Sequence, residues 1–382
     1  MSDQARPSRG TRPANRRALI LAAATDLFSA RGYEHVAISD IAAEVAVSPS
    51  ALYRHFPSKE QLLVEVVGSI VDDFVAMLAA DPDGDVLAQS AAFALDHRAT
   101  GAIWQRETRH LSPAAFAVAH ERMRAARIAF VDAATAGEPR ATTTSALAAL
   151  SVILSPSFHR IELPRSAYEG LLTDLARRAL ITTFPAAPSP PVAVAGGLQR
   201  VSTRANLLAA AVRLFAERTY ASVSMEDVAR AVGLAPSSLY NHFPTKSDLL
   251  LTALNQANGY LQITLDDVLV RSADPGGALL VLIERYAAFA ARNPRLVNVL
   301  VTGTRNLPVD EGAKLRLEQR QYVGEWVHLY LAARPEVDAE EARVIVQAVL
   351  MTMNDLARSP AIAARPDVEQ VLALLGGQVL GL

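Results

Sequence analysis

A tyrosine, a histidine and a lysine recur in this sequence with the same spacing at two places far apart in the chain. The first set is Tyr53, His55 and Lys59, and the second is Tyr240, His242 and Lys246. A phenol and an imidazole can donate hydrogen bonds, and an ammonium group is a compact positive charge, so each set can contact phosphate oxygens. The repeated spacing indicates that the two sets are positioned by elements that are alike in both places.

The segments that carry these sets are copies of one another. Residues 17–63 align without a gap with residues 204–250, and about half of the aligned positions are identical. A weaker similarity follows, because residues 108–111 (TRHL) resemble residues 304–307 (TRNL). The duplicated segment is therefore expected to be a whole half of the chain. A stretch rich in proline and ending in glycines, 185–199, is expected to link the halves.

Each copy is predicted to contain a helix-turn-helix. In the first copy, apolar residues recur at helical spacing over 20–28, and Gly32 follows as a residue suited to ending a helix. A second short helix is predicted over 38–45. Ser48 and Pro49 then signal a third helix, because serine caps a helix start and proline lacks an N–H that would be unpaired there. Two short helices joined by such a turn form a helix-turn-helix.

The sequences LYRHFPSKEQLL and LYNHFPTKSDLL resemble the signature of TetR-type transcriptional regulators, and an A-x-x-L-F pattern precedes each of them. The resemblance implies an all-α fold, with a three-helix helix-turn-helix DNA-binding domain followed by a helical domain that dimerises and usually binds a small molecule. The copies depart from the pattern in complementary places. Ala46 replaces the glycine of the turn that Gly233 retains, whereas Thr219 replaces Gly32. A non-glycine residue at such a positive-φ position costs about 1 kcal/mol.

The repeat and the resemblance together predict two tandem units divided into six segments. These are a basic N-terminal arm (1–12), DNA-binding domain 1 (13–73), helical regulatory domain 1 (74–184), the linker (185–199), DNA-binding domain 2 (200–260) and helical regulatory domain 2 (261–382). Two interpretations of the arginines in and after the arm stay open. They can enter a minor groove of DNA, or they can belong to a solvated tail.

The third helix of each copy is expected to enter the major groove of DNA. It begins with small residues that let the backbone lie close to base edges, namely Pro49, Ser50 and Ala51 in the first copy and Pro236, Ser237 and Ser238 in the second. By the resemblance, the tyrosine, histidine and lysine sets hold the phosphate backbone. Because phosphate contacts carry no sequence information, base discrimination is expected from the positions that differ between the copies. These pairs are Ser39 and Glu226, Ser48 and Ala235, Ala51 and Ser238, and Arg54 and Asn241.

These features predict a ligand-responsive repressor whose two halves pack as an intramolecular pseudo-dimer, with helices near 142–158 and 338–357 in the central bundle. The partners expected are an imperfectly palindromic double-stranded operator and an unknown small-molecule effector. Candidate effector contacts are Trp104, Arg109, Arg305 and Trp326. The alternative roles are core packing for the tryptophans and, for the arginines, surface ion pairs with neighbours such as Glu107. Alternatives for the whole protein are a homodimer with four helix-turn-helix units, a helical adaptor that binds a protein through the same face, and a helical enzyme.

Composition limits the other functions. The chain has 382 residues, of which 51% are hydrophobic and 6% aromatic, a formal net charge of −2 and no cysteine. The lack of cysteine excludes disulfides, thiolate catalysis and cysteine-ligated zinc. No H-E-x-x-H, P-loop or G-x-G-x-x-G motif is present, so no enzyme activity and no cofactor are expected. Near-neutral charge requires any DNA-binding surface to be local. Without a signal peptide or a membrane span, the protein is expected in the cytoplasm.

Overall fold

The computed structural model describes residues 16–186, 201–218 and 220–382, and within these residues it contains helices and no β-strand. The predicted all-α fold is therefore confirmed. The predicted arm, most of the predicted linker and Thr219 lie outside the described residues. The first half contains α1 (Arg16–Arg31), α2 (Ile38–Glu44), α3 (Pro49–Tyr53), α4 (Lys59–Ala80), α5 (Val86–Asp96), α6 (Ala99–Arg106), the 3-10 turn η1 (Thr108–His110), α7 (Pro113–Ala136), α8 (Thr143–Leu154), η2 (Ser155–Phe158) and α9 (Arg165–Leu180).

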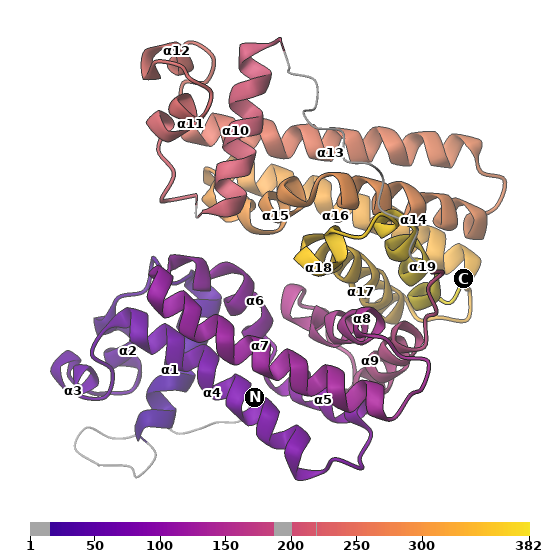
Figure 1. Ribbon diagram of the computed structural model, residues 1–382, viewed down its shortest axis with the longest axis horizontal. Helices are drawn as coiled ribbons and strands as arrows, with labels where there is room; N and C mark the ends of the chain where they lie inside the picture. The colour runs from indigo at the N-terminus through magenta and orange to yellow at the C-terminus, as the bar shows by residue number, and fades with distance from the viewer. Residues whose placement is uncertain (1–15, 187–200, 219) are drawn as a thin grey trace. The chain divides into compact units, whose positions relative to one another are not determined.

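The second half repeats these elements in the same order (Figure 1). It contains α10 (Thr203–Glu217), α11 (Met225–Ala231), α12 (Pro236–Tyr240), α13 (Lys246–Arg271), α14 (Pro275–Arg292), α15 (Pro294–Gly303), η3 (Thr304–Asn306), α16 (Val309–Ala333), α17 (Ala339–Arg358), α18 (Pro360–Ala363) and α19 (Val368–Leu380). The similar residues 108–111 and 304–307 fall on equivalent 3-10 turns, η1 and η3. This order agrees with duplication of a whole half of the chain.

Short-range capping explains where the helices of each DNA-binding domain begin. The Ser48 hydroxyl accepts the backbone N–H of Ala51 at 3.2 Å at the start of α3, and Ser58 accepts the N–H of Gln61 at 3.0 Å at the start of α4. In the second copy, Ala235 precedes Pro236 and offers no side-chain cap to α12. Because a serine-to-alanine change at such a position typically costs about 1 kcal/mol, the second recognition helix begins with the weaker cap.

The core of each DNA-binding domain is made by the large apolar residues that the repeat shares. Phe28, Leu52 and Phe56 are at most 1% exposed, and their counterparts in the second copy, Phe215, Leu239 and Phe243, are at most 3% exposed. Fully burying one such side chain stabilises the fold by about 1.5–3 kcal/mol. The same core therefore holds α1 to α4 together in the first copy and α10 to α13 in the second.

The helices α4 and α13 continue past their DNA-binding domains. The boundaries predicted after residues 73 and 260 fall inside these helices, which end at Ala80 and Arg271. Each DNA-binding domain thus shares one unbroken helix with the helices that follow it. No helix in the described part of the chain is long and apolar enough to cross a membrane.

The chain divides into two compact units that do not coincide with the two copies. The first unit contains Met1–Pro139 and Pro156–Arg160, and the second contains Arg140–Ser155 and Ile161–Leu382. Each can be described by itself. The first unit holds α1 to α7, and the second unit holds the whole second copy together with α8 and α9 of the first copy.

Within the second unit, α8 and α9 of the first copy pack with α17 and α19 of the second copy (Figure 1), and we call these four helices the inter-copy bundle. Most of their buried side chains are small or aliphatic; Ala149, Val152 and Val349 are 0% exposed. Polar links also cross the bundle: the Ser151 hydroxyl donates to Asp355 Oδ2 at 2.8 Å, and the Arg178 guanidinium donates to the Val379 carbonyl at 3.4 Å. The sequence predicted α8 and α17 as bundle helices but did not identify α9 and α19.

Candidate nucleic-acid interface

The start of each recognition helix is exposed to solvent, as a helix that enters a groove requires. In α3, Ser48, Pro49 and Ser50 are exposed and Ala51 is half-buried. In α12, Ala235, Pro236 and Ser237 are exposed and Ser238 is half-buried. Leu52 and Leu239, both 0% exposed, hold the opposite side of each helix in the core. The residues predicted to approach base edges therefore share one accessible face in each copy.

The tyrosines of the two sets are large aromatic residues left in solvent. Tyr53 is 49% exposed and Tyr240 is 46% exposed, although each directly follows a fully buried leucine. His55 is exposed and His242 is half-buried. The structure thus places these phenols and imidazoles at the end of the recognition helix, outside the apolar core. Their predicted contact with a phosphate backbone therefore requires no rearrangement of the core.

The two lysines have partners inside their own domains. The Lys59 ammonium lies 4.1 Å from the ring centre of Tyr33, and the Lys246 ammonium lies 4.3 Å from that of Tyr220. Lys246 Nζ also donates to the carbonyl oxygens of Tyr220 at 2.8 Å and Val223 at 3.0 Å. These contacts fasten the start of α13 to the loop after α10. The phosphate contact assigned to both lysines stays a prediction, and the structure adds a positioning role.

Burial and nearby carboxylates shift the pKa of Lys59, the lysine of the first copy, in opposite directions. Partial burial lowers the pKa of Lys59, and the smaller effects of Glu34, Asp40 and Glu107 raise it. Burial also raises the pKa of Tyr33, whose ring faces this ammonium. A lysine packed on an aromatic face in this way is held in one place before any DNA arrives.

The turns of the two helix-turn-helix units adopt the backbone conformation that the resemblance implied. Ala46 has φ of +53° and Gly233 has φ of +73°. Gly32, at the end of α1, has φ of +85°. Ala46 is a non-glycine residue in the left-handed region, where an L-residue is strained by about 1–2 kcal/mol. The first copy therefore forms its turn at a cost that the second copy avoids.

Except for the half-buried Ala51 and Ser238, the positions expected to discriminate bases lie on exposed surface in both copies. Ser39 of α2 and Glu226 of α11 are exposed, and so are Arg54 and Asn241, which follow the recognition helices. The α2 and α11 starts also differ. Ser224 caps α11 by accepting the N–H of Asp227 at 3.1 Å, whereas at Ala37 the only cap is the Asp40 carboxylate, which accepts the Ala37 N–H at 2.9 Å.

Two arginines that precede the helix-turn-helix units have equivalent positions. The Arg17 guanidinium lies 5.2 Å from the ring centre of Phe56 and pairs with Glu65 at 2.6 Å. The Arg204 guanidinium lies 4.5 Å from the ring centre of Phe243. Both guanidiniums therefore cover the edge of a DNA-binding core. Arg6, Arg9 and Arg12 lie outside the described residues.

A buried carboxylate that the sequence had not identified connects DNA-binding domain 1 to α6 and η1. Glu107 is only 6% exposed, and its Oε2 accepts the backbone N–H of Tyr33 at 2.8 Å. In the second copy the aligned residue is Gly303, so this bond has no equivalent there. The one available signal was the position of Glu107 beside the TRHL segment, which by itself suggested a surface ion pair.

The four candidate effector contacts are divided between the two units, with Trp104 and Arg109 in the first and Arg305 and Trp326 in the second. Trp326 is 0% exposed and packs edge-on against Tyr286 and Tyr322 in the core of the second unit. Trp104 is half-buried and stacks on Phe116 in the first unit. Their roles in binding an effector remain predictions.

Arg109 and Arg305, the other two candidates, occupy equivalent turns, with Arg109 half-buried and Arg305 exposed. Their place after α6 and α15 supports the equivalence of the halves. Any contact of either guanidinium with an effector stays a prediction.

Comparison with known proteins agrees with these features. The model of the family described as bacterial regulatory proteins, tetR family, matches residues 20–66 and again residues 207–253. Three solved structures each resemble about half of the chain. A TetR-family regulator from Bordetella parapertussis is 24% identical, and the match covers 46% of this chain and 95% of that chain with a TM-score of 0.42. The ketosteroid regulator KstR2 of Mycobacterium tuberculosis is 23% identical, with coverages of 48% and 95% and a TM-score of 0.41. AibR in complex with isovaleryl coenzyme A and operator DNA is 18% identical, with coverages of 46% and 97% and a TM-score of 0.40.

The first match of the family model covers the helix-turn-helix formed by α2 and α3, and the second match covers the one formed by α11 and α12. Each match contains the exposed tyrosine, the serine and proline residues at the helix start, and the buried leucine and phenylalanine of the core. The chain therefore contains two tetR-family helix-turn-helix domains in tandem and is a tandem TetR-like DNA-binding regulator.

Proposed function

We propose that this protein is a ligand-responsive repressor in which one chain supplies both halves of a pseudo-dimer. The observation that carries the proposal is the inter-copy bundle. Helices α8 and α9 of the first copy share a core with α17 and α19 of the second copy inside one compact unit. A regulator with two recognition helices places them about one DNA turn, roughly 34–36 Å, apart. One chain that contains both helices needs no second chain to bind two half-sites.

Burial in the bundle supports an intramolecular pairing. Ala146, Ala148 and Ala149 of α8 are 0% exposed, and so are Leu172 and Ala176 of α9. Apolar area removed from water contributes about 25 cal/mol per Å². Because α17 and α19 lie against these helices, separation of the copies would expose part of this apolar surface to water. The two halves are therefore expected to stay together.

The mass of the protein in solution tests this arrangement. Light scattering coupled to size exclusion is expected to give the mass of one chain, 40.9 kDa, with DNA bound and without it. A protease site inserted in 185–199 supplies a second test, because the halves are expected to remain associated after cleavage. A mass of two chains would support four helix-turn-helix units instead, and separation of the cleaved halves would contradict the shared core.

The differences between the recognition helices predict the symmetry of the operator. Arg54 can donate to guanine and Asn241 can pair with adenine, so we expect an operator with two unlike half-sites. Selection of bound sequences from random DNA, followed by footprinting, measures both halves at once. The variant Arg54→Asn is expected to make the selected operator more symmetric. Equal protection of a perfect palindrome by the unchanged protein would contradict the expectation.

Regulation is expected to act through the distance between the two DNA-binding domains. An effector can shift this distance only if it binds the DNA-free arrangement more tightly. A promoter that holds the selected operator should be transcribed less in a reconstituted assay when the protein is added, and a cell extract that contains the effector should restore transcription. Increased transcription on addition of the protein would instead indicate an activator.

A further inference from the structure

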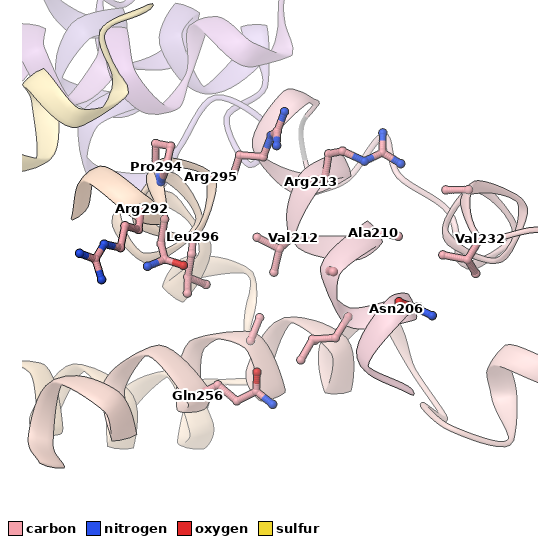
Figure 2. Close-up of a pocket in the computed structure, with 15 residues that line it drawn as sticks. Asn206, Ala210, Val212, Arg213, Val232, Gln256, Arg292, Pro294, Arg295 and Leu296 are labelled. Carbon is pink, nitrogen blue, oxygen red and sulfur yellow. The ribbon is translucent and has the colours of Figure 1, made fainter. Parts of the chain in front are cut away.

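A cleft with a volume of about 800 Å³ lies in the second unit beside DNA-binding domain 2 (Figure 2). Residues of α10 line one side, the start of α15 lines another, and Gln256 of α13 lies across from both. This volume falls in the range of small-molecule sites, about 300–1,000 Å³. The cleft contains three arginines, Arg213, Arg292 and Arg295, and no acidic residue is among the residues that line it.

Two of these guanidiniums are poorly neutralised. Arg213 lies 3.6 Å and Arg295 lies 3.5 Å from the carboxylate of Glu217, so two positive charges share one negative charge at distances too long for a strong hydrogen bond. Their side chains are 41% and 61% exposed. Arg292, by contrast, makes two hydrogen bonds to Glu369, at 2.7 and 2.9 Å. Arg213 and Arg295 therefore leave one positive charge available to an anion.

The start of α15 adds to the positive potential of the cleft. This helix begins at Pro294. Its N-cap residue Asn293 makes no side-chain cap bond, and its amide Nδ2 donates to the Phe289 carbonyl at 2.9 Å. The first-turn N–H groups of a helix attract negative charge. Apart from Asn206 and Gln256, the remaining lining is apolar and includes Leu208, Val212 and Leu296. An anionic group beside the arginines and an apolar chain along these residues would both find complementary surface.

The first copy shows that this charge is not required by the fold. When the copies are aligned as Leu27 with Leu214 and Thr108 with Thr304, Arg213 corresponds to Asp26, Arg292 to Asp96, Arg295 to Ala99 and Ala231 to Glu44. Burial, and to a smaller extent the nearby Glu44, raises the pKa of Asp26. The corresponding surface of the first copy would repel an anion.

We propose that this cleft binds an amphipathic anion, that is, a carboxylate or phosphate monoester attached to a short apolar chain, at one site per chain. Its occupant would touch α10, the first helix of DNA-binding domain 2, and α15, which packs against α17 of the inter-copy bundle. At present Asn298 Nδ2 ties these helices by donating to the Ala216 carbonyl at 3.1 Å. A ligand between α10 and α15 therefore changes the placement of DNA-binding domain 2. This regulatory part rests on the proposed function, whereas binding itself does not.

Calorimetry on the full chain tests binding with four probes. Octanoate and octyl phosphate represent the two anionic groups, octylamine carries the same chain with a positive charge, and inorganic phosphate lacks the chain. At least one of the two amphipathic anions should bind at one molecule per chain, inorganic phosphate should bind about tenfold more weakly or worse, and octylamine should not bind. Equal binding of octylamine, or no binding of either amphipathic anion, would overturn the site.

Two variants locate the site. Arg295→Ala installs the residue type of the first copy, and Arg213→Ala removes the facing guanidinium; each should weaken anion binding about tenfold, as expected for the loss of one charge-assisted hydrogen bond. Arg271→Ala is the matched control, because Arg271 is an exposed arginine of α13 that pairs with Asp267 and does not line the cleft. Unchanged affinity in both cleft variants, with native circular dichroism, would overturn the assignment.

A DNA-binding titration separates the two parts of the proposal. Anion binding should change the affinity of the full chain for its selected operator, and Arg295→Ala should abolish that change without altering DNA affinity in the absence of the anion. Failure to bind any DNA would refute the proposed function while leaving the calorimetric result intact. Anion binding with no change in DNA affinity would overturn the regulatory role of the cleft.

Discussion

The turns of the two helix-turn-helix units contain a matched pair of positions, one in each copy, at which the cost of backbone strain can be measured. Ala46 and Gly233 align in the repeat, and both have positive φ, +53° and +73°. A Cβ atom added at Gly233 would meet no atom within 4 Å. The variant Gly233→Ala therefore introduces conformational strain without a steric clash, and Ala46→Gly removes the same kind of strain from the first copy.

The expected size of both effects follows from two opposing contributions. A left-handed conformation costs an L-residue about 1–2 kcal/mol. Glycine loses more freedom on folding, which offsets about 0.5–1 kcal/mol of any gain. The free energy of opening DNA-binding domain 1 should therefore rise by about 0.5–1 kcal/mol in Ala46→Gly. That of DNA-binding domain 2 should fall by a similar amount in Gly233→Ala.

Native-state hydrogen exchange measures each domain separately. The amides of Val47 and Leu234 close the two turns, donating to Ala42 at 2.9 Å and to Ala229 at 3.0 Å. Exchange at Val47 should slow about two- to fivefold in Ala46→Gly, and exchange at Leu234 should accelerate by a similar factor in Gly233→Ala.

A glycine placed inside a helix supplies the control. Ala22→Gly, at an exposed position of α1, should destabilise DNA-binding domain 1 by about 1 kcal/mol, since glycine is unfavourable in a helix. The strain argument would be refuted if Ala46→Gly behaved like Ala22→Gly and accelerated exchange, or if Gly233→Ala left exchange at the second turn unchanged.

Four further variants test the interface, the bundle and the pH dependence of stability. Tyr53→Phe should weaken operator binding about tenfold in fluorescence anisotropy through loss of a hydrogen bond to a phosphate; unchanged affinity would contradict the contact. Lys59→Ala should lower the slope of log K against log salt by about 0.9, and an unchanged slope would restrict Lys59 to its positioning role. Burial, with a smaller effect of Arg98, lowers the pKa of His159 to about 4. The unfolded chain therefore gains a proton below about pH 6.5 that the folded chain does not bind. Stability should fall by up to about 3 kcal/mol as the pH drops to 4, and His159→Gln should remove that part of the pH dependence in urea denaturation. Ser151→Ala should destabilise the inter-copy bundle by about 1 kcal/mol, and no change in its urea midpoint would show that the bond to Asp355 contributes nothing.

Features that depend on neighbours in the chain were predictable. Ser48 and Pro49 start α3 because the serine hydroxyl and the missing proline N–H act within one helical turn. The positive φ at Ala46 follows from its alignment with Gly233. The burial of Phe28 and Phe56 follows from helical spacing. The exposed tyrosines followed from the family resemblance rather than from periodicity.

Features that depend on distant partners were not predictable. The sequence assigned the lysines to phosphates, yet Lys246 also donates to the carbonyl groups of Tyr220 and Val223, which precede α11 in the chain. Glu107 suggested a surface ion pair, yet it is buried and accepts the Tyr33 N–H. In both cases the partner is a backbone group, whose position no side-chain pattern reveals.

The sequence by itself determined that this chain contains two helix-turn-helix units, because duplication and capping are written in local order and need no tertiary information. Only the tertiary structure decided that α8 and α9 complete a core with α17 and α19, since small aliphatic helix faces fit many partners equally well. It alone also brought Arg295 of α15 to Glu217, the carboxylate that Arg213 meets one turn away on α10, and so placed both arginines at one cleft (Figure 2). The net charge of −2 had concealed that local positive surface, because charges cancel over the whole chain but not across a few ångströms.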